Sequence, residues 1–118
     1  MPADEAAAQA AGGALTIVDV RTPGEWRSTG IPQGAVQVPL NHPGGIEAFL
    51  EEVSEAVDGD KERPIAFICA AGGRSSAAQK LAREAGFTAV ADIDEGMLGS
   101  SGGPGWIARG LPTEACGC

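Results

Sequence analysis

The chain is poor in aromatic residues and histidine, and it has no long apolar run. Only 4% of its 118 residues are aromatic, tyrosine is absent and histidine occurs once. The core therefore has to be built from Val, Ile, Leu and Ala. No apolar run approaches the roughly 18 residues that indicate a membrane-spanning helix. The start, Met-Pro-Ala-Asp-Glu-Ala, lacks the basic and Leu-rich stretches of a secretory signal, so we expect a cytoplasmic protein.

Basic residues are also scarce, and this limits the kind of partner. Eight Lys and Arg stand against 16 Asp and Glu, which gives a net charge of −8. Such a surface repels nucleic acid and anionic membranes, so neither is expected as a partner. A binding site for a small anion would have to be local, made by a loop and one or two arginines.

Cysteine occurs three times, at Cys69, Cys116 and Cys118. An odd number in a chain without a signal sequence argues against a disulfide scaffold and favours reactive thiols. The Cys-Gly-Cys ending has too few ligands for a metal site and no nearby His or Cys to complete one, so we predict neither metal nor cofactor. Two interpretations of it stay open: a mobile tail, or a sulfur relay in which Cys116 or Cys118 takes sulfur from Cys69 by exchange.

The order of apolar segments predicts one α/β domain over residues 14–113, between a flexible segment 1–13 and a tail 114–118. Strands alternate with amphipathic helices, which is typical of a parallel sheet with helices on both faces. Thr22 is a plausible N-cap for a short helix, and His42, in an Asn-His-Pro-Gly turn, is expected on a surface loop. Strands are predicted at 15–20, 35–40, 65–69 and 89–93, and helices from residue 22, at 46–57, at 74–85 and from residue 106.

The residues around Cys69 carry the strongest functional signal. The apolar run Ile-Ala-Phe-Ile ends at this cysteine, and Ala-Ala-Gly-Gly leads to Arg74 and Ser75 at the start of a helix. Ligands of α/β sheets bind at the carboxyl ends of strands, where backbone N–H groups of the loop and helix start attract negative charge. A thiol held there is shifted toward the reactive thiolate. The alternative interpretation is a buried structural cysteine that closes a strand.

Four motifs in order resemble the rhodanese family of single-domain sulfurtransferases, from about Leu15 to Thr113. The loop from Cys69 to Ser75 resembles the family's Cys-x-x-Gly-x-Arg-Ser. The other three are Asp19-Val20-Arg21 with Glu25, Gly30-Ile31-Pro32-Gln33-Gly34-Ala35 with Pro39, and Glu95-Gly96-Met97 with Trp106 and Gly110-Leu111-Pro112. The resemblance implies a three-layer α/β fold with a parallel sheet of about five short strands.

Three features depart from the family pattern. Ile31 stands where the family often has histidine, and Gly99–Gly105 resembles an insertion. Ala70 occupies a loop position where many relatives carry arginine or another larger residue, which weakens the expected binding of thiosulfate, a dianion.

The resemblance also implies a reaction and the residues that perform it. A donor such as thiosulfate would give its outer sulfur to Cys69, and a thiol, cyanide or a partner protein would remove it from the persulfide. Arg74 would bind the donor or brace the loop. Asp19 is expected to be structural, and Arg21 and Glu25 are expected to form a surface ion pair. Substrate contacts are predicted from Ala70, Ala71, Gly72, Gly73, Arg74 and Ser75.

Two other functions remain open. One is a non-catalytic or regulatory binding module, or a protein sulfur carrier. The other is a phosphatase or arsenate reductase of similar architecture. Those enzymes have five residues between cysteine and arginine, whereas four separate Cys69 from Arg74, so the smaller loop favours a sulfane sulfur.

Overall fold

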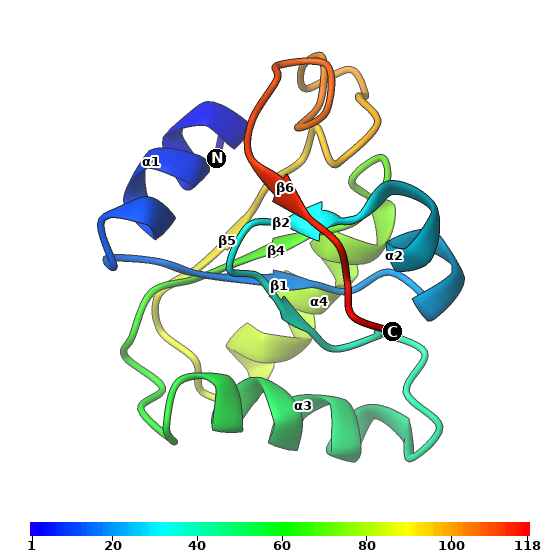
Figure 1. Ribbon diagram of the computed structural model, residues 1–118. Helices are drawn as coiled ribbons and strands as arrows, with labels where there is room; N and C mark the ends of the chain where they lie inside the picture. The colour runs from blue at the N-terminus through cyan, green and yellow to red at the C-terminus, as the bar shows by residue number, and fades with distance from the viewer.

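The computed structural model describes residues 1–118 and has a four-stranded parallel sheet at its centre (Figure 1). The strand order is β3-β1-β4-β5, so β1 and β4 occupy the middle. In register, Asp19 at the end of β1 lies beside Ile68 at the end of β4. The parallel strands are β1 (Thr16–Asp19), β3 (Val36–Gln37), β4 (Ile65–Ile68) and β5 (Val90–Asp92).

Helices cover both faces of this sheet, as the sequence predicts (Figure 1). They are α1 (Ala3–Ala11), α2 (Pro23–Thr29), α3 (Gly45–Ala56) and α4 (Gly73–Glu84). Ile65 and Phe67 of β4 pack with α3 and α4, whereas Ala66 and Ile68 pack with α1 and the segment that follows β5. A strand that is buried on both sides reads as a continuous apolar run, which is why this strand is evident in the sequence.

A second, two-stranded sheet lies outside the parallel one. β2 (Ile31–Pro32) pairs antiparallel with β6 (Thr113–Glu114), so that the end of the chain is fastened beside the end of α2. No helix is long and apolar enough to cross a membrane.

The expectation of a flexible segment 1–13 is wrong for most of its length. Ala3 and Ala6 of α1 are fully buried against the sheet. Glu95 Oε2 accepts a hydrogen bond from Ala3 N at 3.0 Å, and the terminal ammonium of Met1 donates to Asp92 O at 2.8 Å. Alanine side chains give little periodic signal in the sequence, yet their small size lets the helix approach the sheet closely.

Two further expectations about elements are corrected. The chain from Trp106 forms turns rather than a helix, because Trp106 N and Ile107 N donate to Gly96 O and Met97 O. The helix predicted at 46–57 runs from Gly45 to Ala56, and its first predicted residue, Ile46, is 54% exposed, whereas Phe49 and Val53 form the buried face.

Candidate active site

Three strand ends bring the candidate site together. Asp19, Cys69 and Asp92 end or directly follow β1, β4 and β5, which are parallel neighbours, so they share one edge of the sheet. α2 and α4 begin after β1 and β4 at this same edge. The loop from Cys69 to Gly72 leads directly into α4, as the sequence predicts.

Glycine is required at two positions where this loop meets the segment after β5. Gly72 has φ +99°, and a Cβ atom on it would lie 2.4 Å from Asp94 O. A Cβ atom on Gly96 would lie 2.3 Å from Ala70 O. The backbones can therefore approach closely enough for Met97 N and Leu98 N to donate to Cys69 O and Ala70 O, at 2.8 and 3.0 Å. Cys69 O and Ala70 O thus bond to this segment, and the N–H group of Gly72 is directed at the Cys69 sulfur.

The Cys69 sulfur is held by the loop and by the first turn of α4. Gly72 N donates to Sγ at 3.1 Å, and Sγ lies 3.4 Å from Ser75 Oγ, which itself donates to Gly72 O at 3.1 Å. Burial acts to raise the pKa of the Cys69 thiol, but bonds from the Ser75 hydroxyl and from the backbone N–H groups of Ser75, Gly72 and Ala71 outweigh it and lower this pKa. The site therefore favours thiolate.

Cys69 is also deeply buried. Its exposed fraction is 1%, Ser75 is fully buried, and Cys69 lines neither of the two cavities of the structure. Ala71 and Gly73 of the same loop are exposed. A donor molecule can reach the sulfur only if this short loop moves, so both readings of Cys69, structural and reactive, find support in its geometry.

Arg74 braces the loop through an ion pair with α2. Its Nη1 and Nη2 lie 2.6 and 2.9 Å from Glu25 Oε1 and Oε2, a two-point contact across 49 residues of sequence. This bond to Arg74 lowers the pKa of Glu25 to about 2. Glu25 also completes a capping box with Thr22, so the predicted N-cap is confirmed and the same carboxylate joins α2 to α4.

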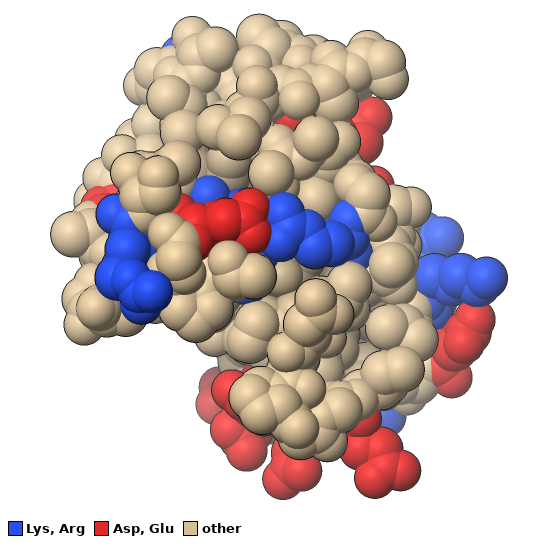
Figure 2. Space-filling model, turned by 90° about the vertical axis from the view of Figure 1, so that its right-hand side faces the viewer, with Lys and Arg blue, Asp and Glu red and all other residues tan.

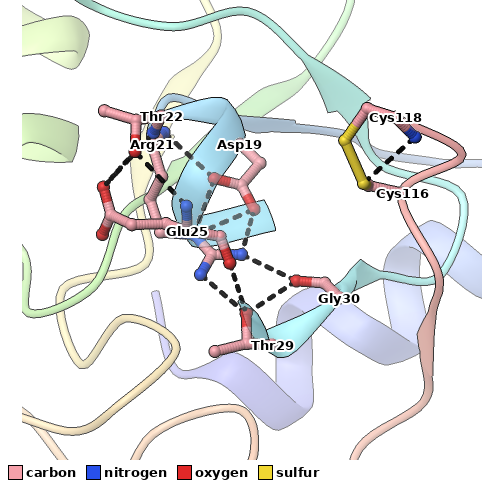
Figure 3. The surroundings of a disulfide bond; sticks show 8 residues. All are labelled: Asp19, Arg21, Thr22, Glu25, Thr29, Gly30, Cys116 and Cys118. Atoms are coloured by element: carbon pink, nitrogen blue, oxygen red, sulfur yellow. Dashed lines mark hydrogen bonds and ion pairs between the residues drawn. A yellow bond between two sulfur atoms is a disulfide. The ribbon is translucent and has the colours of Figure 1, made fainter. Parts of the chain in front are cut away.

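The predicted ion pair between Arg21 and Glu25 is wrong. Arg21 precedes α2, so the i, i+4 spacing that brings side chains together on a helix does not apply to it. Instead it is buried against Asp19, with Nη2 2.8 Å from Oδ2, and it also donates to Thr29 Oγ1 and Gly30 O (Figure 3). Asp19 therefore holds Arg21, which binds the C-terminal end of α2, in line with the structural role expected for it.

The charged side chains of this face gather in two regions. Figure 2 shows a row of basic and acidic side chains across its middle, and acidic side chains gathered below, at the level of α3. His42 belongs to the latter region, where its ring contacts Glu52 of α3. No broad basic patch is present on this face, so attraction of an anion depends on the loop itself.

The structure also places two acidic groups, Asp92 and Glu95, for which the sequence predicted no role. Asp92 Oδ1 is buried without a hydrogen-bond partner, and desolvation raises the pKa of this carboxyl. Glu95 is fully buried and binds Arg109, with Nε to Oε1 at 2.6 Å, as well as Ala3 N and Gly105 N. Asp92 ends β5, which was the available signal for it. No group of three His, Cys, Asp or Glu side chains is placed to hold a metal ion.

The two tail cysteines are not free thiols in this structure. Cys116 and Cys118 form a disulfide, so the relay through a tail thiolate is not available in this state (Figure 3). The first residue of the predicted tail, Glu114, is held in place, because β6 pairs with β2. Neither the disulfide nor β6 was predicted from the sequence, and Thr113-Glu114 is too short to be recognised as a strand.

Known proteins share both the sequence pattern and the fold. The model of the rhodanese-like domain family matches residues 2–101. An uncharacterised protein of Rickettsia prowazekii is 30% identical over 104 residues, which are 83% of this chain and 81% of that protein. The crystal structure of the Alr3790 protein of Anabaena sp. is 28% identical, with 100% of this chain and 94% of that chain covered and a TM-score of 0.76.

A third similar structure is that of a rhodanese from E. coli solved with anions. It is 29% identical, with 74% of this chain and 87% of that chain covered, and the TM-score is 0.58. The family match extends over the helix α1, the whole parallel sheet and the loop that holds the Cys69 sulfur. The chain belongs to the rhodanese-like domain family.

Proposed function

We propose that this protein is a sulfurtransferase that moves sulfane sulfur, from a donor such as thiosulfate to a thiol or cyanide, through a persulfide on Cys69. The observation that carries the proposal is the hydrogen bond that Gly72 N donates to Cys69 Sγ, beside the Ser75 hydroxyl, at the carboxyl end of β4. A bond donated to this sulfur favours the thiolate, which is the nucleophile in sulfur exchange. Membership of the rhodanese-like family supports the same reaction class.

The reaction would take place in two displacements. The Cys69 thiolate attacks the outer sulfur of thiosulfate, a new S–S bond forms, and sulfite leaves with the electron pair of the broken S–S bond. A thiolate or cyanide then attacks the outer sulfur of the persulfide, and Cys69 leaves as thiolate. The backbone N–H groups of Ala71, Gly72 and Ser75 would stabilise the charged sulfur, as an oxyanion hole stabilises oxygen.

Substrate access sets a requirement on the loop. Because Cys69 is 1% exposed, residues 70–73 have to shift before a donor can reach it. Arg74 is engaged by Glu25, so its role in this scheme is to hold the start of α4 in place. The reaction needs Cys69 in its reduced form, which is maintained in the cytoplasm, the compartment we propose.

A second candidate function rests on the same burial. A rhodanese-like module that binds a partner, or carries sulfur for a partner protein, would need no open pocket for a small donor at Cys69. The absence of Cys69 from both cavities favours this reading.

Intact mass measured after incubation with thiosulfate separates the two candidates. The protein is reduced, treated with thiosulfate, freed of excess reagent and compared with Cys69→Ser. A gain of one sulfur that depends on Cys69 and is removed by cyanide supports the sulfurtransferase. If neither thiosulfate nor other sulfane donors add sulfur to Cys69, the proposed transfer is wrong and the binding module remains.

A further inference from the structure

The tail disulfide has a defined position on the molecule. The Cα atoms of Cys116 and Cys118 are 5.3 Å apart, within the range that a disulfide spans. Gly117 between them has φ +71°, a conformation that favours glycine. Cys118 is exposed and Cys116 is half-buried, so the bond can be reached from solvent.

Residues before the disulfide fasten it to the domain. β6 pairs with β2, and Pro112 O accepts hydrogen bonds from Trp106 Nε1 at 2.9 Å and from Gln33 N at 3.1 Å. A Cβ atom on Gly30 would lie 2.7 Å from Glu114 O, which shows how closely the tail approaches the end of α2. The cysteines therefore follow an anchored segment by only two residues.

A cavity of about 570 Å³ lies between this tail and α2. Its volume is in the range of small-molecule sites. Arg27, which lines it, is exposed and makes no ion pair with any carboxylate. Trp26, which also lines it, has a buried indole N–H without an acceptor. Glu114 of β6 lines it as well, and its carboxylate accepts a hydrogen bond from Gly34 N.

We propose that Cys116 and Cys118 form a second, redox-active site that exchanges with low-molecular-weight anionic thiols bound in this cavity. Exposed disulfides are the ones that exchange readily, and a nearby cation stabilises the thiolate that leaves. Arg27 supplies that charge and would also attract the anionic group of the incoming thiol. This site operates independently of Cys69 and of the proposed sulfur transfer.

The exchange consumes two thiols for each tail disulfide. The first thiolate attacks one tail sulfur and forms a mixed disulfide with it. The Cys116–Cys118 bond breaks in this step, and the other tail sulfur leaves as thiolate. A second thiolate attacks the small-molecule sulfur of the mixed disulfide and releases the small-molecule disulfide. Two electrons pass from the two thiols to the tail, and their protons end on Cys116 and Cys118; excess small-molecule disulfide drives the reverse reaction.

The Cys69→Ser variant isolates the tail thiols for the test. Oxidised protein is mixed with either 2-mercaptoethanesulfonate, which is anionic, or 2-mercaptoethanol, which is neutral. Samples are quenched with iodoacetamide at successive times, and the intact mass counts the alkylated thiols. Two alkyl groups per chain should appear, and dilution into the oxidised reagent before the quench should prevent them.

Arg27→Gln and the matched control Arg63→Gln test the role of the cavity. Each removes one exposed positive charge, but Arg63 lies outside the cavity and pairs with Asp58. We expect Arg27→Gln to slow reduction by both thiols, because the leaving thiolate loses its cation, and to slow the anionic thiol about threefold more than the neutral one, the size expected for one screened charge pair.

Two results would overturn the proposal. The first is a tail disulfide that stays unalkylated over hours in millimolar concentrations of either thiol. The second is an equal rate with the anionic thiol for Arg27→Gln and Arg63→Gln. Because Cys69 is absent from all these variants, neither result bears on sulfur transfer by the wild-type protein.

Discussion

Ser75 is the side chain that most directly tunes the Cys69 sulfur. Its hydroxyl lies 3.4 Å from Sγ, and it is among the groups that lower the pKa of this thiol against the effect of burial. We expect Ser75→Ala to raise that pKa and to slow alkylation of Cys69 at neutral pH by about fivefold, because a bond to a charged group is lost. Ser76→Ala, on the exposed side of the same turn, is the control. Equal pH profiles of iodoacetamide alkylation for the two variants would show that Ser75 does not tune the thiol.

Gly96 allows the closest backbone contact at the site. A Cβ atom there would lie 2.3 Å from Ala70 O, a backbone atom that cannot rotate away. We expect Gly96→Ala to lower the free energy of unfolding by about 1–3 kcal/mol, the usual cost of overpacking, measured by urea denaturation. Gly34→Ala is the comparison, since Gly34 also has a positive φ but meets nothing within 4 Å. Similar losses in both variants would mean that φ strain, and not the contact with Ala70, determines the cost.

At the scale of elements, α1 is a structural part of the domain. Ala3 and Ala6 pack in the same cluster as Ile17 and Ile68 of the sheet, and Ala3 N is bonded to Glu95. Deletion of residues 2–11 should expose the outer face of β1 and β4 and lower the thermal midpoint. Circular dichroism on heating measures this. An unchanged midpoint would show that residues 2–11 do not stabilise the domain.

α2 is held to α4 by one ion pair with consequences for acid stability. Because the folded-state pKa of Glu25 is lowered to about 2 from 4.5, the unfolded chain binds its proton first as pH falls. The contribution of this group is therefore complete above about pH 4.5 and is lost as pH falls toward 2.

We expect Glu25→Gln to flatten the decline of unfolding free energy across this window. The variant should be less stable than wild type at neutral pH and closer to it near the acid end, as urea titrations at several pH values would measure. Glu47→Gln, an exposed substitution at the start of α3, provides the control. Parallel curves for wild type and Glu25→Gln would contradict the lowered pKa.

For the molecule as a whole, charge distribution rather than net charge governs what approaches the site. The chain is acidic overall, and the cations near Cys69 are engaged: Arg74 binds Glu25 and Arg21 binds Asp19. The attraction for a dianionic donor thus rests on the N–H groups of the loop. Raising the salt concentration should accordingly change the apparent affinity for thiosulfate by less than about threefold. The salt dependence of cyanide-coupled turnover measures this, and a steep dependence would point to a free cation at the site.

The alternating strands and helices, the family and the position of Cys69 at the end of a strand could be predicted from the sequence alone. These follow from local signals: the apolar run of β4, the capping residue Thr22 and the short Gly-containing loop before Arg74. Each requires only neighbouring residues, so it can be recognised without the fold. The amphipathic spacing of α3 was equally recognisable, although Ile46 in its first turn is exposed.

Which charges pair and which segments are buried depends on the fold. Glu25 pairs with Arg74 and not with Arg21, and the Ala-rich α1 is part of the core. The place of the Cys116–Cys118 disulfide beside α2 depends on the pairing of β6 with β2. Ion pairing, small-residue packing and strand pairing of this kind depend on distances between segments far apart in the chain. Sequence spacing sets such distances only within one helix or strand.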